Sequence, residues 1–213
     1  MQTFIVDFFK TTGGLCPTID FLDALDTKMK AKVLRTIMLL EQNGNDLREP
    51  YSKPLGDGLF ELRIQHATDI SRVLYFFTIG NRIILTHGFV KKTQKTPKAE
   101  IVRAKNIVQI IFKERSCQMS DFKTYLNQQL ENPEFKTEWN ALEPEFNTIQ
   151  AIIDARKKCN MTQKELAEKT GIDQSDISKI ETGNANPALS TLKRLADGTD
   201  MILRLEFIPK GAK

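Results

Sequence analysis

The segment at residues 162–183, TQKELAEKTGIDQSDISKIETG, restricts the fold of this chain more than any other stretch. Thr162 and Glu165 have the S/T-x-x-E spacing of a capping box, in which side chain and backbone at a helix start satisfy each other's hydrogen bonds. Gly171 suits the left-handed turn that ends a helix, and Asp173 is a residue type that caps the next one. The pattern predicts two short helices joined by a tight turn.

The apolar residues of this segment are spaced to fill the interface between the two helices, while the polar residues of the second helix remain outside. The apolar set is Leu166, Ile172, Ile177 and Ile180, and the exposed polar set is Gln174, Ser175, Ser178 and Lys179. The segment resembles the Cro/repressor-like helix-turn-helix, the module of HigA-type antitoxins. The resemblance implies that the second helix reads operator DNA in the major groove and that Gln163 contacts a phosphate. A helical bundle used only for protein docking is the alternative.

Charge argues that one copy of this motif binds DNA weakly, because carboxylates outnumber lysines between residues 162 and 181. Near the C-terminus, the apolar run at 201–208 alternates like a β-strand and could pair with the same run of a second copy. We therefore expect a homodimer that places two motifs on a palindromic operator.

The 213 residues are enough for two modest hydrophobic cores, so we expect two domains. A cut after Cys117 leaves 18 Lys and Arg against 12 Asp and Glu in the first part, and 13 against 15 in the second. A basic first domain favours a polyanion such as RNA, although lysines that only give solubility would produce the same excess. The chain lacks the roughly 20 consecutive apolar residues that cross a bilayer. Its N-terminus does not look like a secretory signal, and we expect a cytoplasmic protein without membrane contact.

Periodicity in the first half predicts an α+β domain in which helices pack on a small antiparallel sheet. The expected strands are at 3–9, 59–65, 72–78 and 82–89, and the expected helices begin near Pro17, at about 27 and at Thr96 and Pro97. The run at 59–65 alternates strictly, so Arg63 and its polar neighbours face away from the apolar side. With the helix-turn-helix that follows, the expected fold is an α+β domain and then an all-α domain with a short C-terminal strand.

Three segments of the first half resemble the HigB type, the phage-derived branch of the RelE-like toxins. They are ELR at 61–63, RVLYFF at 72–77 and HGFVKKTQKTPKAEI at 87–101. The resemblance covers nearly all of residues 1–115. It implies an endoribonuclease that cuts messenger RNA on the translating ribosome without a metal or other cofactor. The three cysteines, which include no CxxC pair, and the two histidines support neither a disulfide framework nor a zinc site.

Cleavage of this kind needs a ribose 2′-hydroxyl to attack the neighbouring phosphate while cations neutralise the developing charge. The candidate catalytic residues are Arg63, Arg72, His87, Lys91 and Lys92, and the candidate RNA-binding residues are Lys95 and Lys98. The two arginines suit a phosphate clamp, and His87 titrates near neutrality. Each has a structural alternative. Arg63 could pair with a carboxylate on the sheet, His87 could be a half-buried hydrogen-bonding residue, and the lysines could only solvate a strand edge.

The HigB and HigA families normally form two separate chains, whereas here the two modules are continuous. We divide the chain into a toxin-like domain at 1–117 and an antitoxin-like domain at 118–213, with the helix-turn-helix at about 148–198 and a dimerisation strand at about 201–208. Met119 looks like a former start of a separate chain. The amphipathic residues 120–142 pack either on the first domain or in the core of the second.

The sequence thus predicts a toxin-antitoxin module in one chain. Its first part is a ribosome-dependent messenger RNA endoribonuclease, and its second part inhibits the first, binds operator DNA and represses its own operon. The alternative is a DNA-binding regulator whose first domain is an inactive RNA- or protein-docking module.

Overall fold

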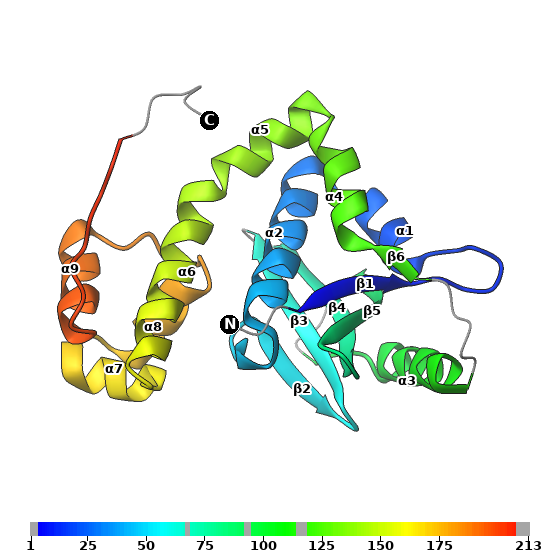
Figure 1. The fold of residues 1–213 in the computed structure, drawn as a ribbon, viewed down its shortest axis with the longest axis horizontal. Helices are drawn as coiled ribbons and strands as arrows, with labels where there is room; N and C mark the ends of the chain where they lie inside the picture. Colours follow the sequence, from blue (N-terminus) through cyan, green and yellow to red (C-terminus); the bar gives the residue numbers. More distant parts are fainter. Residues whose placement is uncertain (1–3, 67–68, 92–94, 114–118, 208–213) are drawn as a thin grey trace. The chain divides into compact units, whose positions relative to one another are not determined.

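The computed structural model describes residues 4–66, 69–91, 95–113 and 119–207, and the chain divides into two compact units, Met1–Glu143 and Pro144–Lys213 (Figure 1). The first unit combines a small sheet with helices, and the second is helical, which confirms the expected fold class. In these described ranges, every helix is too short or too polar to cross a membrane.

The sheet of the first unit has six strands in the order β2-β3-β4-β5-β1-β6. The strands are β1 Ile5–Phe9, β2 Ser52–Gly56, β3 Leu59–His66, β4 Asp69–Thr78, β5 Arg82–Val90 and β6 Met119–Asp121. The antiparallel meander of β3, β4 and β5 is confirmed, but β1 lies parallel to β5, so the sheet is mixed. Neither β2 nor β6 was expected, because β2 contains Pro54 and β6 is too short to show alternation.

The α-helices of the first unit's described residues are α1 Pro17–Asp23, α2 Thr27–Asn43, α3 Lys98–Lys113, α4 Phe122–Leu130 and α5 Pro133–Ala141. Local capping explains where two of them begin. The side chain of Asp26 accepts a hydrogen bond from the Met29 amide at the start of α2, and Asn132 accepts from two amides at the start of α5.

Two successive residues of β1 show which helices cover which face of the sheet. Phe9 packs with Ile107 of α3, whereas the ring of Phe8 makes edge-to-face contacts with Phe122 and Tyr125 of α4. Because neighbouring residues of a strand point to opposite faces, α3 and α4 lie on opposite sides of the sheet. Figure 1 shows α1 and α2 on the same side as α4. We name the two sides the α3 face and the α2 face.

A close approach on the α2 face depends on Gly88 of β5. A Cβ built at Gly88 would lie 2.1 Å from Cδ1 of Phe21, a residue of α1. Only glycine leaves room for that ring, so α1 can lie directly on β5.

The helices α4 and α5 belong to the first unit, which decides between the two interpretations of residues 120–142. Their large side chains Phe122, Tyr125, Phe135 and Trp139 are buried, and the Arg35 guanidinium of α2 lies over the Trp139 ring. The compact units divide after Glu143. The domain boundary after Cys117, which lies outside the described residues, stays a prediction.

The second unit is built from α6 Glu143–Lys158, whose first residue closes the first unit, followed by α7 Gln163–Thr170, α8 Gln174–Glu181 and α9 Leu189–Gly198. The four apolar residues expected between α7 and α8 are all buried and share a core with Ile152 and Leu195. The capping box of Thr162 and Glu165 is present, and Gly171 has the left-handed φ of 66°. Asp173 occupies the N-cap position of α8, but its side chain makes no capping hydrogen bond.

The expected C-terminal strand is absent from the described residues 201–207, which run extended without strand pairing. A strand needs a hydrogen-bonded neighbour, and the second unit contains no other strand in its described part. The alternation at 201–208 was therefore not sufficient to form a strand within one chain; residue 208 lies outside the described residues.

Candidate nucleic-acid interfaces

The register of β3 and β4 places Arg63 directly opposite Arg72. Both belong to the α3 face, because Leu59 and Leu74, at the same strand parity, pack against Ala104 of α3. The two arginines expected to act together are thus brought together.

A buried carboxylate lies between these arginines. Oε1 of Glu61 is 3.3 Å from Nε of Arg63 and 3.8 Å from Nε of Arg72, and the Glu61 side chain is only 2% exposed. The hydroxyl of Thr96 donates a hydrogen bond to Oε2 of Glu61. Pairing of Arg63 with a carboxylate is therefore present, but the carboxylate is shared by two cations.

The two arginines differ in how far they reach solvent. The Arg63 side chain is 29% exposed, whereas that of Arg72 is 7% exposed and donates to the backbone carbonyls of Ser71 and Ile64. Burial lowers the pKa of Arg72 to about 10, against the opposing effect of Glu61. Arg72 therefore remains charged at neutral pH, but most of its surface contacts protein.

The Nε atoms of Arg63 and Arg72 are both buried and make no hydrogen bond within the described part of the chain. A buried donor without a partner costs about 1–3 kcal/mol, so such atoms are uncommon unless a ligand or another function requires them. The two ion pairs with Glu61 therefore leave hydrogen-bonding capacity on both guanidinium groups.

Lys91, which follows β5, adds a third cation to this group. Partial burial lowers the pKa of Lys91, and the neighbouring charges of Arg72 and Arg63 lower it further, while Glu61 raises it. Lys91 has the strand parity of Phe89, which is opposite Arg72 and packs against the Leu59, Leu74 and Ala104 cluster, so Lys91 lies on the α3 face with the two arginines. We name Arg63, Arg72 and Lys91 the cation cluster, with Glu61 as its central carboxylate.

His87 lies on the same face but has no exposed surface. Its Nδ1 is 3.1 Å from the Thr86 hydroxyl, and its Nε2 is 3.0 Å from Oε2 of Glu100 on α3. Burial and the charge of Arg103 lower the pKa of His87, whereas Glu100 raises it. The ring thus contacts protein groups on both nitrogens, as the structural interpretation supposed, and it is more deeply buried than that interpretation required.

The remaining candidates are the lysines that follow β5 along the chain. Lys95 and Lys98 are exposed, and Lys92 lies outside the described residues.

Glu61 and Thr96 were not expected at the site. The alternation had placed Glu61 beside Arg63 on the polar face, which was the available signal, but it did not reveal that this face is partly buried by α3. In the described part of the chain, the His, Cys, Asp and Glu side chains form no group that could hold a metal ion.

In the second unit, α8 presents the expected polar surface. Gln174, Ser175 and Lys179 are exposed and Ser178 is half-buried, while Ile177 on the opposite side is fully buried. The Lys179 ammonium pairs with Asp176 at 2.7 Å on the helix surface. Such an exposed pair is weak and can be exchanged for a phosphate contact.

Gln163 has a partner that the sequence did not predict. Its side-chain amide donates to Oε2 of Glu181 at 2.6 Å, and the Arg156 guanidinium binds the same buried carboxylate at 3.0 Å. This network ties α6, α7 and α8 together. It fixes the orientation of Gln163 at the start of α7, where a phosphate contact was expected.

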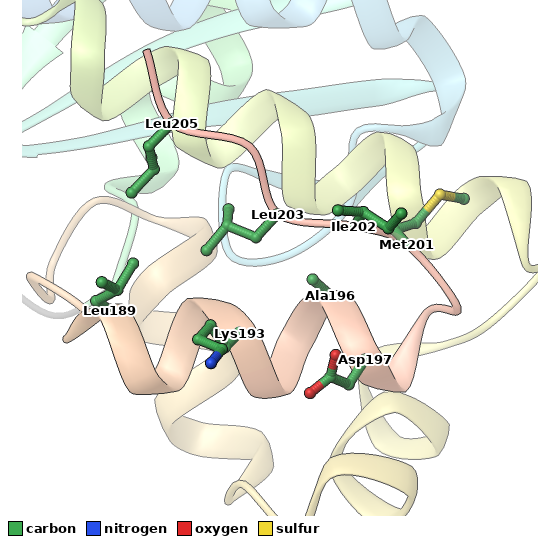
Figure 2. Close-up of a pocket in the computed structure, with 8 residues that line it drawn as sticks. All are labelled: Leu189, Lys193, Ala196, Asp197, Met201, Ile202, Leu203 and Leu205. Atoms are coloured by element: carbon green, nitrogen blue, oxygen red, sulfur yellow. The ribbon is translucent and has the colours of Figure 1, made fainter. Parts of the chain in front are cut away.

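An apolar groove lies between α9 and the extended C-terminal segment (Figure 2). Its volume is about 380 Å³, and its lining residues are Leu189, Lys193, Ala196, Asp197, Met201, Ile202, Leu203 and Leu205. In Figure 2, Leu203 and Leu205 point from the segment toward α9. Ile202 is 96% exposed, and Phe207 is fully exposed, so the segment leaves large apolar side chains in water.

Two family comparisons match the two parts of the chain. Residues 20–109 match the family described as phage derived protein Gp49-like, and residues 152–201 match the helix-turn-helix family. The first match contains β2 to β5 with the whole cation cluster, and the second contains α7 to α9. The chain therefore carries a Gp49-like domain followed by a helix-turn-helix domain.

Individual relatives are also similar to part of this chain. Antitoxin HigA1 of Mycobacterium tuberculosis is 36% identical over 74 residues, which is 35% of this chain and 50% of that protein. An HTH-type transcriptional regulator of Haemophilus influenzae is 38% identical over 47 residues, 22% of this chain and 48% of that protein. The chain thus spans about half the length of these curated relatives. The combination is consistent with a fusion of the HigB/HigA toxin-antitoxin type.

Proposed function

We propose that this chain is a toxin-antitoxin module in which the first unit is a metal-independent endoribonuclease that cuts messenger RNA on the ribosome. The second unit is its antitoxin, which inhibits cleavage, binds operator DNA as a homodimer and represses its own operon. Both targets place the protein in the cytoplasm. The observation that carries the nuclease proposal is the cation cluster around Glu61 within a Gp49-like domain.

In the proposed reaction, the scissile phosphate binds at the partly exposed side chains of Arg63 and Lys91. The ribose 2′-hydroxyl loses its proton to water and attacks the phosphorus, and the bond to the 5′-oxygen breaks as that oxygen takes a proton from water. Arg72, which is mostly buried, contributes its positive charge from behind them and stabilises the charge that develops on the phosphate. Lys92, Lys95 and Lys98 contact the RNA backbone on either side. His87 holds the Glu100 side chain in position and does not itself transfer a proton, because an imidazole without exposed surface cannot reach a 2′-hydroxyl.

A specific observation favours the alternative of an inactive docking domain. Arg63 and Arg72 both form ion pairs with Glu61, and His87 is fully buried, so three of the candidate catalytic groups have protein partners. The partly exposed side chain of Arg63 argues for a site that a further anion can reach. The two functions therefore need a direct test.

The test compares residues 1–143, the complete first unit, with its Arg63→Ala variant, in growing cells and in a translation extract. We expect the unit to stop growth and to cut translated messages, and the variant to cleave at least about 100-fold more slowly. Arg48→Ala, which removes an exposed arginine of the same unit, is the matched control and should leave cleavage unchanged. A folded first unit that neither stops growth nor cuts messages would establish the docking alternative.

Binding of operator DNA is assigned to the exposed face of α8. Gln174 and Ser175 are placed to reach base edges, and glutamine can pair with adenine through two hydrogen bonds. Ser178 and Lys179 contact base edges or backbone, and Gln163 approaches a phosphate from the start of α7. The match of residues 152–201 to the helix-turn-helix family supports the assignment.

A further inference from the structure

We propose that residues 119–141, which we name the docking arm, would keep the second unit bound to the rest of the first unit even if the chain were cut between residues 113 and 119. The helices of the arm bind on the side of the sheet opposite to the cation cluster. The arm comprises β6, α4 and α5. The inference rests on the proposed function only in treating the two modules as toxin and antitoxin. The inference goes further by naming the segment that attaches the antitoxin to the toxin and the toxin surface that this attachment leaves open.

The first part of the arm extends the sheet of the first unit. β6 pairs antiparallel with β1, with Phe9 opposite Met119 and Asp7 opposite Asp121. Without this pairing β1 would be an edge strand with unpaired backbone groups. Addition of a strand to an exposed edge is a common way for one chain to bind another.

The second part of the arm covers apolar surface on the α2 face. The Phe8 ring is 6.1 Å from that of Phe122 and 5.8 Å from that of Tyr125, both in edge-to-face geometry. The Tyr125 hydroxyl donates to Oδ1 of Asp23 at 2.6 Å. These contacts join α4 to β1 and α1, which stand more than a hundred residues earlier in the chain.

The third part of the arm packs Trp139 against a buried cation, Arg35. Arg35 of α2 is 5% exposed, its Nη2 donates to the backbone carbonyl of Trp139 at 2.8 Å, and its guanidinium carbon lies 4.0 Å from the centre of the Trp139 ring. An aromatic ring over a desolvated guanidinium is strongly attractive. A large aromatic side chain beside an arginine is also the usual composition of an energetic hot spot.

Polar contacts surround these buried groups. The Lys30 ammonium donates to Gln129, the Thr27 hydroxyl donates to Glu134, and the Lys123 ammonium pairs with Glu41. The arm therefore has an apolar centre and a polar rim, which is the arrangement found where separate proteins bind.

The position of the arm separates attachment from inhibition. Phe8, which contacts the arm, and Phe9, which contacts α3, point to opposite faces, and the cation cluster lies on the α3 face. The arm therefore does not cover Arg63 or Lys91. The arm thus attaches residues 144–213 without blocking these two cations.

The experiment introduces a protease site in place of residues 114–118 of the full chain and cuts it. We expect the two pieces to sediment as one particle at low micromolar concentration. Trp139→Ala should weaken their association by about 30-fold or more, as expected for a hot-spot residue. Lys136→Ala, which changes an exposed residue of the same helix, is the control and should have no effect. Thermal melting of the uncut chains establishes that each variant folds, and Trp139→Phe, which retains an aromatic ring, should lose less affinity.

Separation of the cut wild-type pieces, or equal affinities of the Trp139→Ala and Lys136→Ala proteins, would overturn the proposal. The open side is tested by the rate at which phenylglyoxal modifies Arg63 in the uncut chain, which should be the same with and without Trp139→Ala. A clear acceleration in the variant would show that the arm covers the cluster. None of these measurements uses RNA cleavage, so an inactive first unit would not contradict the proposal for the docking arm.

Discussion

At the scale of single residues, the first unit is organised by one buried carboxylate. Arg63 and Arg72 are opposite each other on neighbouring strands, where two like charges repel. Glu61, within 4 Å of both Nε atoms, offsets that repulsion and compensates the burial of Arg72. The same carboxylate keeps the two guanidinium groups beside each other, as a phosphate clamp would require.

Replacement of this carboxylate tests its structural role. Glu61→Gln removes the negative charge and leaves Arg72 buried beside a second cation, so we expect the first unit to lose about 3 kcal/mol of unfolding free energy. The measurement is urea unfolding followed by the fluorescence of Trp139, the single tryptophan of the sequence, which is buried in the first unit.

Asp69→Asn provides the comparison, because it removes an exposed carboxylate at the start of β4 in the same sheet. Its effect should stay within about 0.5 kcal/mol. If the two variants unfold at the same urea concentration, Glu61 does not stabilise the cation cluster.

At the scale of secondary structure, elements specified by local signals were predictable and elements specified by distant partners were not. The capping box, Gly171 and the alternation of β3 each act within a few residues, so the sequence identified α7, α8 and the meander. By contrast, β6 exists only because β1 offers an edge. The run at 201–207 has the alternation of a strand but pairs with no strand among the described residues.

The same distinction applies to the candidate site. Alternation placed Arg63 on the polar side of β3, but the contact between His87 and Glu100 depends on α3, which begins more than ten residues after His87. The sequence likewise predicts Gln163 only as a phosphate contact. Its hydrogen bond to Glu181, eighteen residues later, depends on the packing of α7 against α8.

The capping box of α7 offers a test at this scale. In the structure the Thr162 hydroxyl accepts from the Glu165 amide, while the Glu165 carboxylate accepts from the Thr162 amide at 2.7 Å. Thr162→Ala should destabilise α7 by about 1 kcal/mol, which corresponds to roughly fivefold faster amide exchange in its first turns. Thr162→Ser retains the hydroxyl and should exchange like the parent. Equal exchange rates in the alanine variant would show that packing alone fixes the helix start.

At the scale of the whole molecule, the units divide inside the segment that the resemblance would assign to the antitoxin. The docking arm folds with the first unit, and the helix-turn-helix stands in the second. Carboxylates outnumber lysines in one copy of that motif, so we expect that high operator affinity needs a second copy. The large exposed side chains at 201–207, beside the groove along α9, are the surface that we propose for this dimer.

Ile202→Asp tests the dimer, because the side chain is 96% exposed and its replacement should not disturb the folded chain. We expect light scattering to show a dimer for the parent and a monomer for the variant. Binding to the DNA that precedes its own reading frame should weaken by at least about 100-fold, since two linked motifs gain affinity from each other without new contacts. Phe112→Asp, which places the same charge on an exposed residue of α3, should leave both properties unchanged. A parent protein that is monomeric at working concentration, yet binds the DNA tightly, would mean that one helix-turn-helix is sufficient and that the apolar segment has another partner.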